Sequence, residues 1–392
     1  MRSATAPMHS ASWSRRSSDV SEPLALYIHW PFCVSKCPYC DFNSHVREEI
    51  DEAAWREALL ADLAHEAALL PDRELGSIFF GGGTPSLMPP ATVATLIEAA
   101  TRHWRPTDDI EITLEANPSS VEAGRFVDLA GAGINRVSLG LQAFDDAKLA
   151  FLGRAHGATE GLRALDIAQR HFTRVSFDLI YALPDQDETQ WAADLDRALG
   201  LGTEHLSLYQ LTIEPGTRFA TLASQGKLVP LDTDEAAGLF DLTQDRTDAA
   251  GLPAYEISNH ARPGAESRHN LTYWRYGDYA GVGPGAHGRR DGIATLRHKK
   301  PENWISATNA RGNGLQSEDV LSSKDKAYEA ILMGLRLTEG MDIARDELAA
   351  HINWKSFEKL EKVGIVRRYA DRISATRAGL SVLDGILREI VV

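Results

Sequence analysis

Residues 27–42 read YIHWPFCVSKCPYCDF, and all three cysteines of the chain, Cys33, Cys37 and Cys40, lie in this stretch. The spacing CxxxCxxC, on a loop that contains two prolines, lets three thiolates reach three corners of an iron-sulfur cube. The fourth iron would then have no protein ligand and would be open to a small molecule. The stretch therefore predicts a 4Fe-4S cluster with one open coordination position.

Two other uses of these thiols remain open on the spacing alone. A structural zinc site would add His29 or His45 to the cysteines, and Cys37 with Cys40 has the CxxC spacing of redox pairs. A disulfide framework is excluded, because three cysteines cannot all pair and nothing in the chain predicts secretion.

The length and the composition predict one large catalytic domain and a smaller one. The chain has 392 residues, of which 43% are hydrophobic, which is enough material for more than one packed core. The 41 basic and 55 acidic residues give a formal net charge of −14. This charge disfavours a broad contact with phosphate groups, so we expect no nucleic-acid partner.

The first 22 residues are rich in serine, carry arginines and lack apolar periodicity, so we expect a flexible extension. A mitochondrial transit peptide is the alternative, which the composition resembles only faintly. The chain has no run of eighteen apolar residues, so we expect no transmembrane segment. We expect a cytoplasmic protein, with peripheral contact to membrane partners left open.

Residues 23–250 alternate short apolar runs with amphipathic segments, a pattern typical of successive βα units. Six units are too few for a closed eight-fold barrel, so the pattern predicts an α/β fold with an incomplete (β/α)6 barrel. The site should lie at the C-terminal ends of its strands. The expected strands are 24–28, 77–80, 110–115, 136–139, 175–180 and 205–211, and the expected helices are 52–70, 89–102, 119–130, 158–171, 187–199 and 233–250.

Polar residues and glycines follow several of these expected strands. A glycine triplet in FFGGGTPS, residues 79–86, lets the backbone approach a ligand closely, although a tight turn is the simpler explanation. Glu115 ends its strand, Gln142 follows the next, and Asp178 is an acid within an apolar run that needs a partner or a purpose. Arg154 is a candidate for that partner or for a clamp on a cofactor.

The cysteine motif, with an aromatic residue just before its last cysteine, resembles the defining loop of the radical S-adenosylmethionine (SAM) superfamily. The other positions, in order and spacing, resemble the subfamily that contains oxygen-independent coproporphyrinogen III oxidase and the haem chaperone HemW. The resemblance implies that Cys33, Cys37 and Cys40 ligate a 4Fe-4S cluster and implies a barrel of the same incomplete kind. It also implies SAM contacts at Tyr27, Tyr39, Gly82, Gly83, Thr84, Glu115, Gln142, Arg154 and Asp178.

Residues 251–310, expected to connect two domains, contain the aromatic and basic run RHNLTYWRY at 268–276, which has no helical or strand periodicity. Its rings suit a flat macrocycle, and its arginines suit propionates. A packing loop between domains is the competing explanation. The run is similar to the HNxxYW motif associated with haem binding in this subfamily, which implies haem contacts at His269, Asn270, Tyr273 and Trp274. His269 is the preferred axial ligand, and His287 in a glycine-rich turn is its rival.

In residues 311–392 the sequence pattern changes to two helical stretches, a hairpin and a final helix. This order predicts a small winged-helix-like domain. Winged helices often bind DNA, but this segment carries acids beside its arginines. We therefore expect it to cover a substrate site rather than to read DNA.

Two functions then compete: a haem chaperone that keeps the cluster and SAM, and an oxidase that decarboxylates porphyrinogen propionates. The oxidase pattern has a further cysteine two positions after the third, where this chain has Phe42. Together with the HNxxYW run, this difference favours the chaperone. The resemblance implies haem delivery to respiratory proteins, which in this subfamily are bound to membranes.

Overall fold

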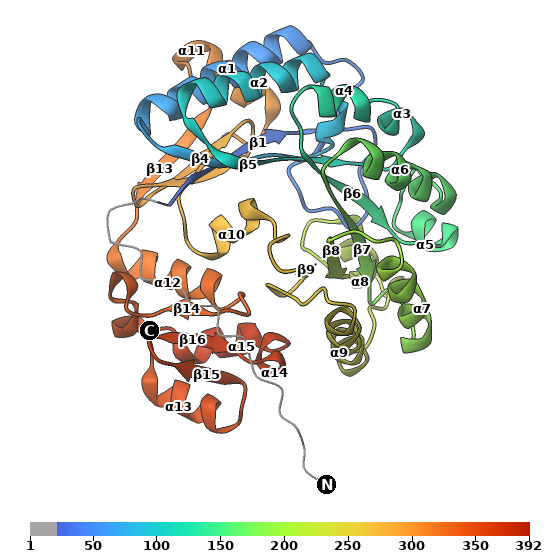
Figure 1. Ribbon diagram of the computed structural model, residues 1–392, viewed down its shortest axis with the longest axis vertical. Helices are drawn as coiled ribbons and strands as arrows, with labels where there is room; N and C mark the ends of the chain where they lie inside the picture. Colours follow the sequence, from blue (N-terminus) through green and yellow to red (C-terminus); the bar gives the residue numbers. More distant parts are fainter. Residues whose placement is uncertain (1–21) are drawn as a thin grey trace.

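The computed structural model describes residues 22–392, so all but the last residue of the expected N-terminal extension lies outside the described residues. Its centre is an eleven-stranded sheet in the order β13-β12-β11-β10-β1-β4-β5-β6-β7-β8-β9. Figure 1 shows this sheet as an open, curved layer that does not close into a barrel. The fold class predicted from the sequence is therefore confirmed.

The six expected strands are present and lie side by side in parallel. Their buried positions combine apolar residues with polar ones, such as Glu111, Ser138 and Ser176. They are β1 (Leu24–Trp30), β4 (Glu74–Gly82), β5 (Arg105–Ala116), β6 (Arg136–Gln142), β7 (Arg174–Tyr181) and β8 (His205–Gln210).

Helices follow these strands and cover the outer side of the curved sheet, while the inner side holds α10 (Figure 1). One expected helix, 119–130, is divided into α3 and α4 at Gly124 and Arg125. Two further short helices, α5 and α8, were not predicted because each has only one buried residue. The helices are α1 (Glu52–Leu69), α2 (Pro90–His103), α3 (Ser120–Ala123), α4 (Phe126–Gly131), α5 (Asp146–Phe151), α6 (Ala158–His171), α7 (Glu188–Leu199), α8 (Arg218–Ser224) and α9 (Thr233–Ala249), and the 3-10 turn η1 is Pro85–Leu87.

The segment expected to be a connector extends the main sheet at both edges. Strand β9 (Asn259–Ala261) pairs antiparallel with β8, and β10 (Tyr279–Val282) pairs parallel with β1. An antiparallel run then continues outward through β11 (His287–Arg290), β12 (Ile293–Arg297) and β13 (Leu315–Val320). Helix α11 (Pro301–Arg311) follows β12 and packs on α1.

The run 268–276 is helical, which corrects the expectation of an irregular segment. Helix α10 spans Arg268–Trp274, and the Ser267 side chain caps its N-terminus by accepting from the amide of Asn270. His269 is the only buried residue of this short helix. A helix that buries a single residue gives no repeating apolar pattern in the sequence, so it could not be predicted from periodicity.

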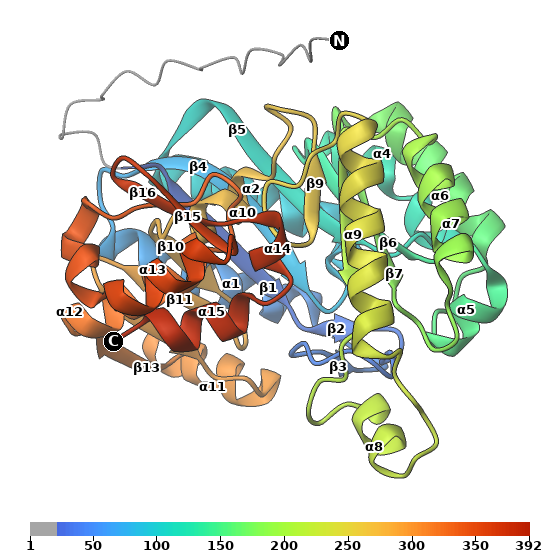
Figure 2. The same cartoon turned by 90° about the horizontal axis from the view of Figure 1, so that it is seen from below.

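The C-terminal residues pack around a second apolar cluster of their own. A three-stranded sheet in the order β14-β16-β15 lies among short helices, an arrangement like the expected winged helix. Figure 2 shows this unit beside α12 and away from β6 and β7. The elements are α12 (Ser323–Gly334), β14 (Met341–Asp342), the 3-10 helix η2 (Arg345–His351), α13 (Trp354–Lys362), β15 (Val366–Tyr369), β16 (Arg372–Ala375), α14 (Arg377–Leu380) and α15 (Leu383–Ile390).

The cysteine loop leaves β1 and returns through the short strands β2 (Phe32–Cys33) and β3 (His45–Val46), which pair with each other. Within residues 22–392, no helix is both long enough and apolar enough to cross a membrane.

Candidate functional site

The cysteine loop and the rim residues of several strands meet in one cleft of about 370 Å³. The cleft lies at the C-terminal ends of the parallel strands, which is where the loops of such sheets build sites. Eleven of the twelve predicted cluster and SAM residues line it, and Tyr27 lines a neighbouring cavity instead. The eleven are Cys33, Cys37, Tyr39, Cys40, Gly82, Gly83, Thr84, Glu115, Gln142, Arg154 and Asp178.

Each cysteine sulfur faces a polar side chain of its own. The Thr84 hydroxyl donates to Cys33 Sγ across 3.4 Å, and Ser44 Oγ lies 3.9 Å from Cys40 Sγ. The Arg154 guanidinium donates to Cys37 Sγ across 3.6 Å. Burial raises the pKa of the Cys33 and Cys40 thiols, and the hydrogen bond from Thr84 opposes this rise at Cys33.

This donor set fits an iron-sulfur cluster, because hydrogen bonds to the sulfurs tune the reduction potential of such clusters. In residues 22–392 no three His, Cys, Asp or Glu side chains are arranged around a single metal ion. A cubane places each thiolate on a different iron, so the three sulfurs need not converge on one point.

Arg154 also joins the cysteine loop to two strands of the sheet. Its Nη1 donates to the Tyr39 hydroxyl across 3.5 Å, and its Nη2 donates to the carbonyl of Gly140 and to Asn117 Oδ1. Asn117 in turn donates to Thr84 Oγ1 across 3.1 Å. One guanidinium therefore links Cys37 and the aromatic residue of the loop to the ends of β5 and β6.

The glycine triplet allows two backbones to approach each other. The amide of Gly83 donates to the carbonyl of Trp30 across 2.7 Å, and a Cβ at Gly83 would lie 2.7 Å from the carbonyl oxygen of Phe32. A side chain at this position would therefore push β4 away from the start of the cysteine loop. The glycine requirement is explained by this packing, and the loop also lines the cleft.

Two carboxyl groups face the cleft from neighbouring parts of the sheet. Burial, with a smaller contribution from the charge of Asp178, raises the pKa of Glu115 to about 8. Burial also raises the pKa of Asp178 to about 6, against the effect of hydrogen bonds from Ser207 and Ser138. Glu115 Oε2 accepts from the amide of Gly82 across 3.3 Å. The cleft thus holds two carboxyl groups, and ionisation of both at once is unfavourable.

Gln142 ends β6 with a left-handed backbone at φ 67°, and the register with β7 shifts at this point. Such a conformation is uncommon for a residue with a side chain and marks a local constraint. The Gln142 amide oxygen is buried without a partner among the described residues, and the side chain lines the cleft.

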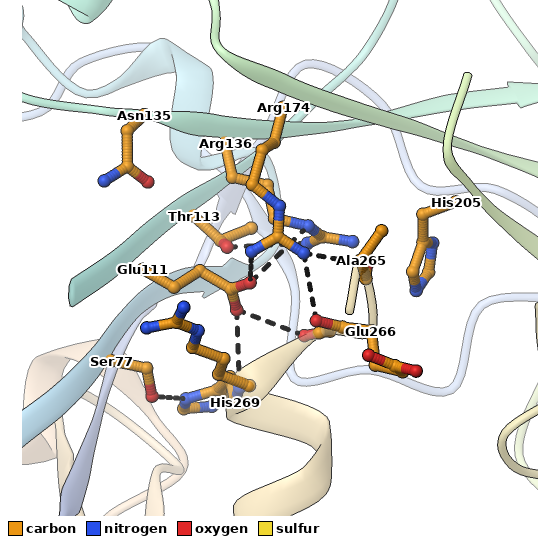
Figure 3. A network of polar contacts seen from close by, with 12 residues as sticks. Ser77, Glu111, Thr113, Asn135, Arg136, Arg174, His205, Ala265, Glu266 and His269 are labelled. Carbon is orange, nitrogen blue, oxygen red and sulfur yellow. Dashed lines mark hydrogen bonds and ion pairs between the residues drawn. The ribbon is translucent and has the colours of Figure 1, made fainter. Parts of the chain in front are cut away.

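A network of polar contacts joins β5, β6 and β7 to the start of α10 (Figure 3). Glu111, on the same strand face as Glu115, forms an ion pair with Arg174 and lies 3.9 Å from the Nε of Arg136. The other carboxylate oxygen of Glu111 accepts a hydrogen bond from the backbone amide of His269 across 3.3 Å. Glu111 therefore fastens the start of α10 to the sheet.

A chain of hydrogen bonds continues from Arg136 to the cleft. Arg136 donates to Ser176 Oγ across 3.0 Å, Ser176 donates to Ser138 Oγ across 2.9 Å, and Ser138 donates to Asp178 Oδ1 across 3.1 Å. The N-terminal end of α10 is in this way connected to a carboxyl group of the cleft.

The four predicted haem residues do not face one cavity. His269 is 2% exposed, and its Nδ1 lies 3.2 Å from Ser77 Oγ, while Nε2 has no partner among the described residues. Asn270 donates to the Tyr255 hydroxyl. Tyr273 and Trp274 line two different cavities. The neighbouring arginines are also engaged, Arg268 with Asp109 and Arg275 with Glu339.

Three polar residues of the cleft, Ser44, Asn117 and Ser138, were not identified from the sequence. Ser44 follows the last cysteine by four positions and Asn117 follows Glu115 by two, so proximity to the motifs was the only available signal. Ser138 lies inside an apolar strand, where its orientation toward Asp178 depends on the pairing of β6 with β7.

Comparisons with known proteins agree with this geometry. Residues 27–198 match the Radical SAM superfamily. The heme chaperone HemW of Escherichia coli (strain K12) is 39% identical over 376 residues, which cover 93% of this chain and 97% of that protein. Radical S-adenosyl methionine domain-containing protein 1, mitochondrial, of Bos taurus is 38% identical and covers 94% of this chain and 87% of its own length.

Among solved structures, coproporphyrinogen III oxidase (HemN) from Escherichia coli superposes with a TM-score of 0.78 at 23% identity, covering 94% of this chain and 90% of that one. This likeness concerns the fold. The superfamily match implies a 4Fe-4S cluster and SAM as cofactors, for which the cleft provides three thiols and a polar wall. With identity near 40% along almost its full length, the chain belongs to the radical SAM superfamily and, within it, to the family of the heme chaperone HemW.

Proposed function

We propose that this protein is a haem chaperone that holds a 4Fe-4S cluster and SAM in the cleft and carries haem as its cargo. One observation supports the cofactor assignment above all others. Three thiols, each with a polar side chain of its own beside it, line the same cleft as Glu115, Gln142 and Asp178. When bound, a reduced cluster of this kind supplies an electron that can cleave the sulfonium of SAM.

Different residues would bind the different parts of these cofactors. Cys33, Cys37 and Cys40 would ligate three irons and leave the fourth to the amino and carboxylate groups of SAM. Glu115 and Asp178, which line the cleft, would accept hydrogen bonds from the ribose and from the polar groups of the cofactor. Arg154 would fix the cysteine loop and balance the negative charge of the thiolates.

The choice of a chaperone over an oxidase is supported by Phe42. This position follows the third cysteine by two, where the oxidase pattern has a further cysteine, and Phe42 as a residue is 61% exposed. The match between this chain and relatives named as heme chaperones extends over almost the whole length of those relatives. As acceptors we propose respiratory haem proteins, including membrane-bound ones, reached from a cytoplasmic location.

The deciding experiment is a haem titration of the anaerobically reconstituted full chain, beside an assay for coproporphyrinogen III decarboxylation. We expect a Soret band that saturates with haem and no loss of propionate carboxylates. Decarboxylation without haem binding would replace the chaperone by the oxidase.

A further inference from the structure

A second cavity, of about 530 Å³, borders the cofactor cleft. The two share Phe42, Gly82 and Glu115 in their walls. The second cavity also contains side chains from elements far apart in the sequence, including Tyr273 of α10 and His287 at the start of β11. Its walls combine aromatic rings, imidazoles and a lysine with the carboxyl groups of Asp41 and Glu115. The rings, imidazoles and lysine match a flat, apolar ligand that has a metal centre and an anionic group.

The two imidazoles of this cavity differ in whether their nitrogens are free to bind a ligand. The Nδ1 of His29 lies 2.9 Å from the Tyr27 hydroxyl, and its Nε2 lies 2.9 Å from the carbonyl of Asn43. Both nitrogens of His29 are thus occupied. His287 is exposed at the rim, and within the described part of the chain neither of its nitrogens has a hydrogen-bond partner. Partial burial and the charge of Lys299 lower the pKa of His287, so the neutral, ligating form prevails at pH 7.

The backbone holds His287 firmly at this rim. A Cβ at Gly281 would lie 1.8 Å from the carbonyl oxygen of His287, so only glycine lets β10 and β11 approach as they do. The turn between them is fixed from two sides. The Asn43 side chain donates to the carbonyl of Pro284 across 2.9 Å, and the buried carboxylate of Asp62 accepts from the amide of Gly283 across 3.0 Å.

The surroundings of His287 supply the other contacts that a haem needs. The exposed phenyl ring of Phe42 and the rings of Tyr273 and Tyr279 provide apolar faces. Lys299, which is exposed beside the cavity, provides a positive charge for a propionate.

His269, by contrast, lies behind this wall. Its ring stacks on Phe79 with centroids 4.7 Å apart and meets Tyr273 edge to face at the same distance. A haem iron could reach His269 only after α10 had separated from β4.

We propose that His287 is the axial ligand of the haem iron, with the macrocycle in the second cavity and Lys299 paired with a propionate. This inference rests on the proposed haem-carrying function and names the site for the cargo. It places the haem next to the cofactor cleft, separated from it by the shared residues Gly82 and Glu115.

The test is a titration of the full chain with ferric haem, followed by absorbance and resonance Raman spectra. His287→Ala should weaken haem binding about tenfold or more, the effect of losing one good interaction, and should abolish the histidine-ligated Soret spectrum. Free imidazole added to this variant should restore that spectrum. His287→Gln keeps the approximate size of the side chain and should lose haem affinity and the histidine-ligated Soret spectrum in the same way. Agreement of the two variants would show that the loss does not come from a cavity left by the smaller alanine.

Two controls separate the outcomes. His103→Ala removes an exposed imidazole at the end of α2, far along the chain from the cavity, and should leave affinity and spectrum unchanged. His269→Ala should keep the histidine-ligated spectrum. If wild-type protein binds haem and both His287 variants match it, the ligand inference is wrong while the chaperone function stands. If wild-type protein binds no haem, the proposed function itself fails.

Discussion

The Nη1 of Arg154 donates to the Sγ of Cys37 across 3.6 Å, although 116 residues of sequence lie between them. The guanidinium is buried at the end of the sheet and carries the only charge that directly contacts a cysteine sulfur among the described hydrogen bonds. A positive charge beside a cluster stabilises its reduced, more negative form.

Arg154→Gln should therefore make the reduction potential of the cluster more negative while the iron and sulfide contents stay near wild type. Spectroelectrochemistry of the reconstituted protein measures this shift. Arg163→Gln, which removes an exposed charge from α6, is the matched control. An unchanged potential in Arg154→Gln would show that the contact with Cys37 does not influence the cluster.

Replacing a single thiol should remove the cluster altogether. We expect Cys37→Ser to lose the iron, the acid-labile sulfide and the visible absorbance after anaerobic reconstitution, because only three protein ligands hold the cube. Elemental analysis of wild-type protein is the reference. Stoichiometric zinc and no iron in that reference would replace the cluster by a structural zinc site.

The strands and the cluster loop were predictable because local signals determine them. Short apolar runs separated by amphipathic segments marked the six parallel strands, and Asn117 and Pro118 after Glu115 indicated that this residue lies at the strand end, where it lines the cleft. The edge strands β10 to β13 were not predicted, because they are short and because they join the sheet only where β10 pairs with β1, which lies far earlier in the chain.

The haem residues show the same limit. Sequence proximity placed His269 to Trp274 in one haem site, and this assignment stays a prediction; in the structure Tyr273 and Trp274 line different cavities. His287 enters the same cavity as Tyr273 only through the pairing of β10 with β1. Such an arrangement follows from the tertiary fold and has no local signal.

Breaking the buried pair at Glu111 should destabilise the protein strongly. Glu111 is 2% exposed and faces both Arg174 and Arg136, so Glu111→Gln leaves buried positive charge without compensation. Loss of one partner of a buried pair costs about 3–5 kcal/mol of unfolding free energy.

Urea denaturation followed by circular dichroism measures this loss. Glu98→Gln, which removes an exposed partner of Arg102 on α2, should change the free energy of unfolding by less than about 1 kcal/mol. Equal stabilities of the two variants would contradict a structural role for Glu111.

Glu115 should make SAM affinity depend on pH. Its pKa is raised to about 8, so the carboxyl group is mostly protonated at pH 7 in the free protein. If ribose hydroxyls donate to the carboxylate, binding favours the ionised form. SAM affinity should then rise as the pH rises through about 8 and level off above it.

Calorimetric titration with SAM between pH 6.5 and 9 tests this dependence. Glu115→Ala should weaken SAM binding roughly ten- to hundred-fold at high pH, since a charged hydrogen bond contributes ~1.5–3 kcal/mol. Glu115→Gln should give a smaller rise with pH than wild type. Wild-type affinity in Glu115→Ala with an intact cluster would place Glu115 outside the SAM site.

Haem binding should not require the cluster. The proposed ligand His287 is carried by a turn that Asp62 fixes from α1, and neither residue contacts a cysteine. Cys37→Ser should therefore bind ferric haem with near wild-type affinity and the same Soret maximum, although its cluster is lost. His287→Ala should show the opposite pattern, because it removes the proposed axial ligand and leaves the thiols in place. Parallel haem titrations and iron analyses of the two variants measure both properties, and loss of haem binding in Cys37→Ser would mean that the cluster itself forms part of the haem site.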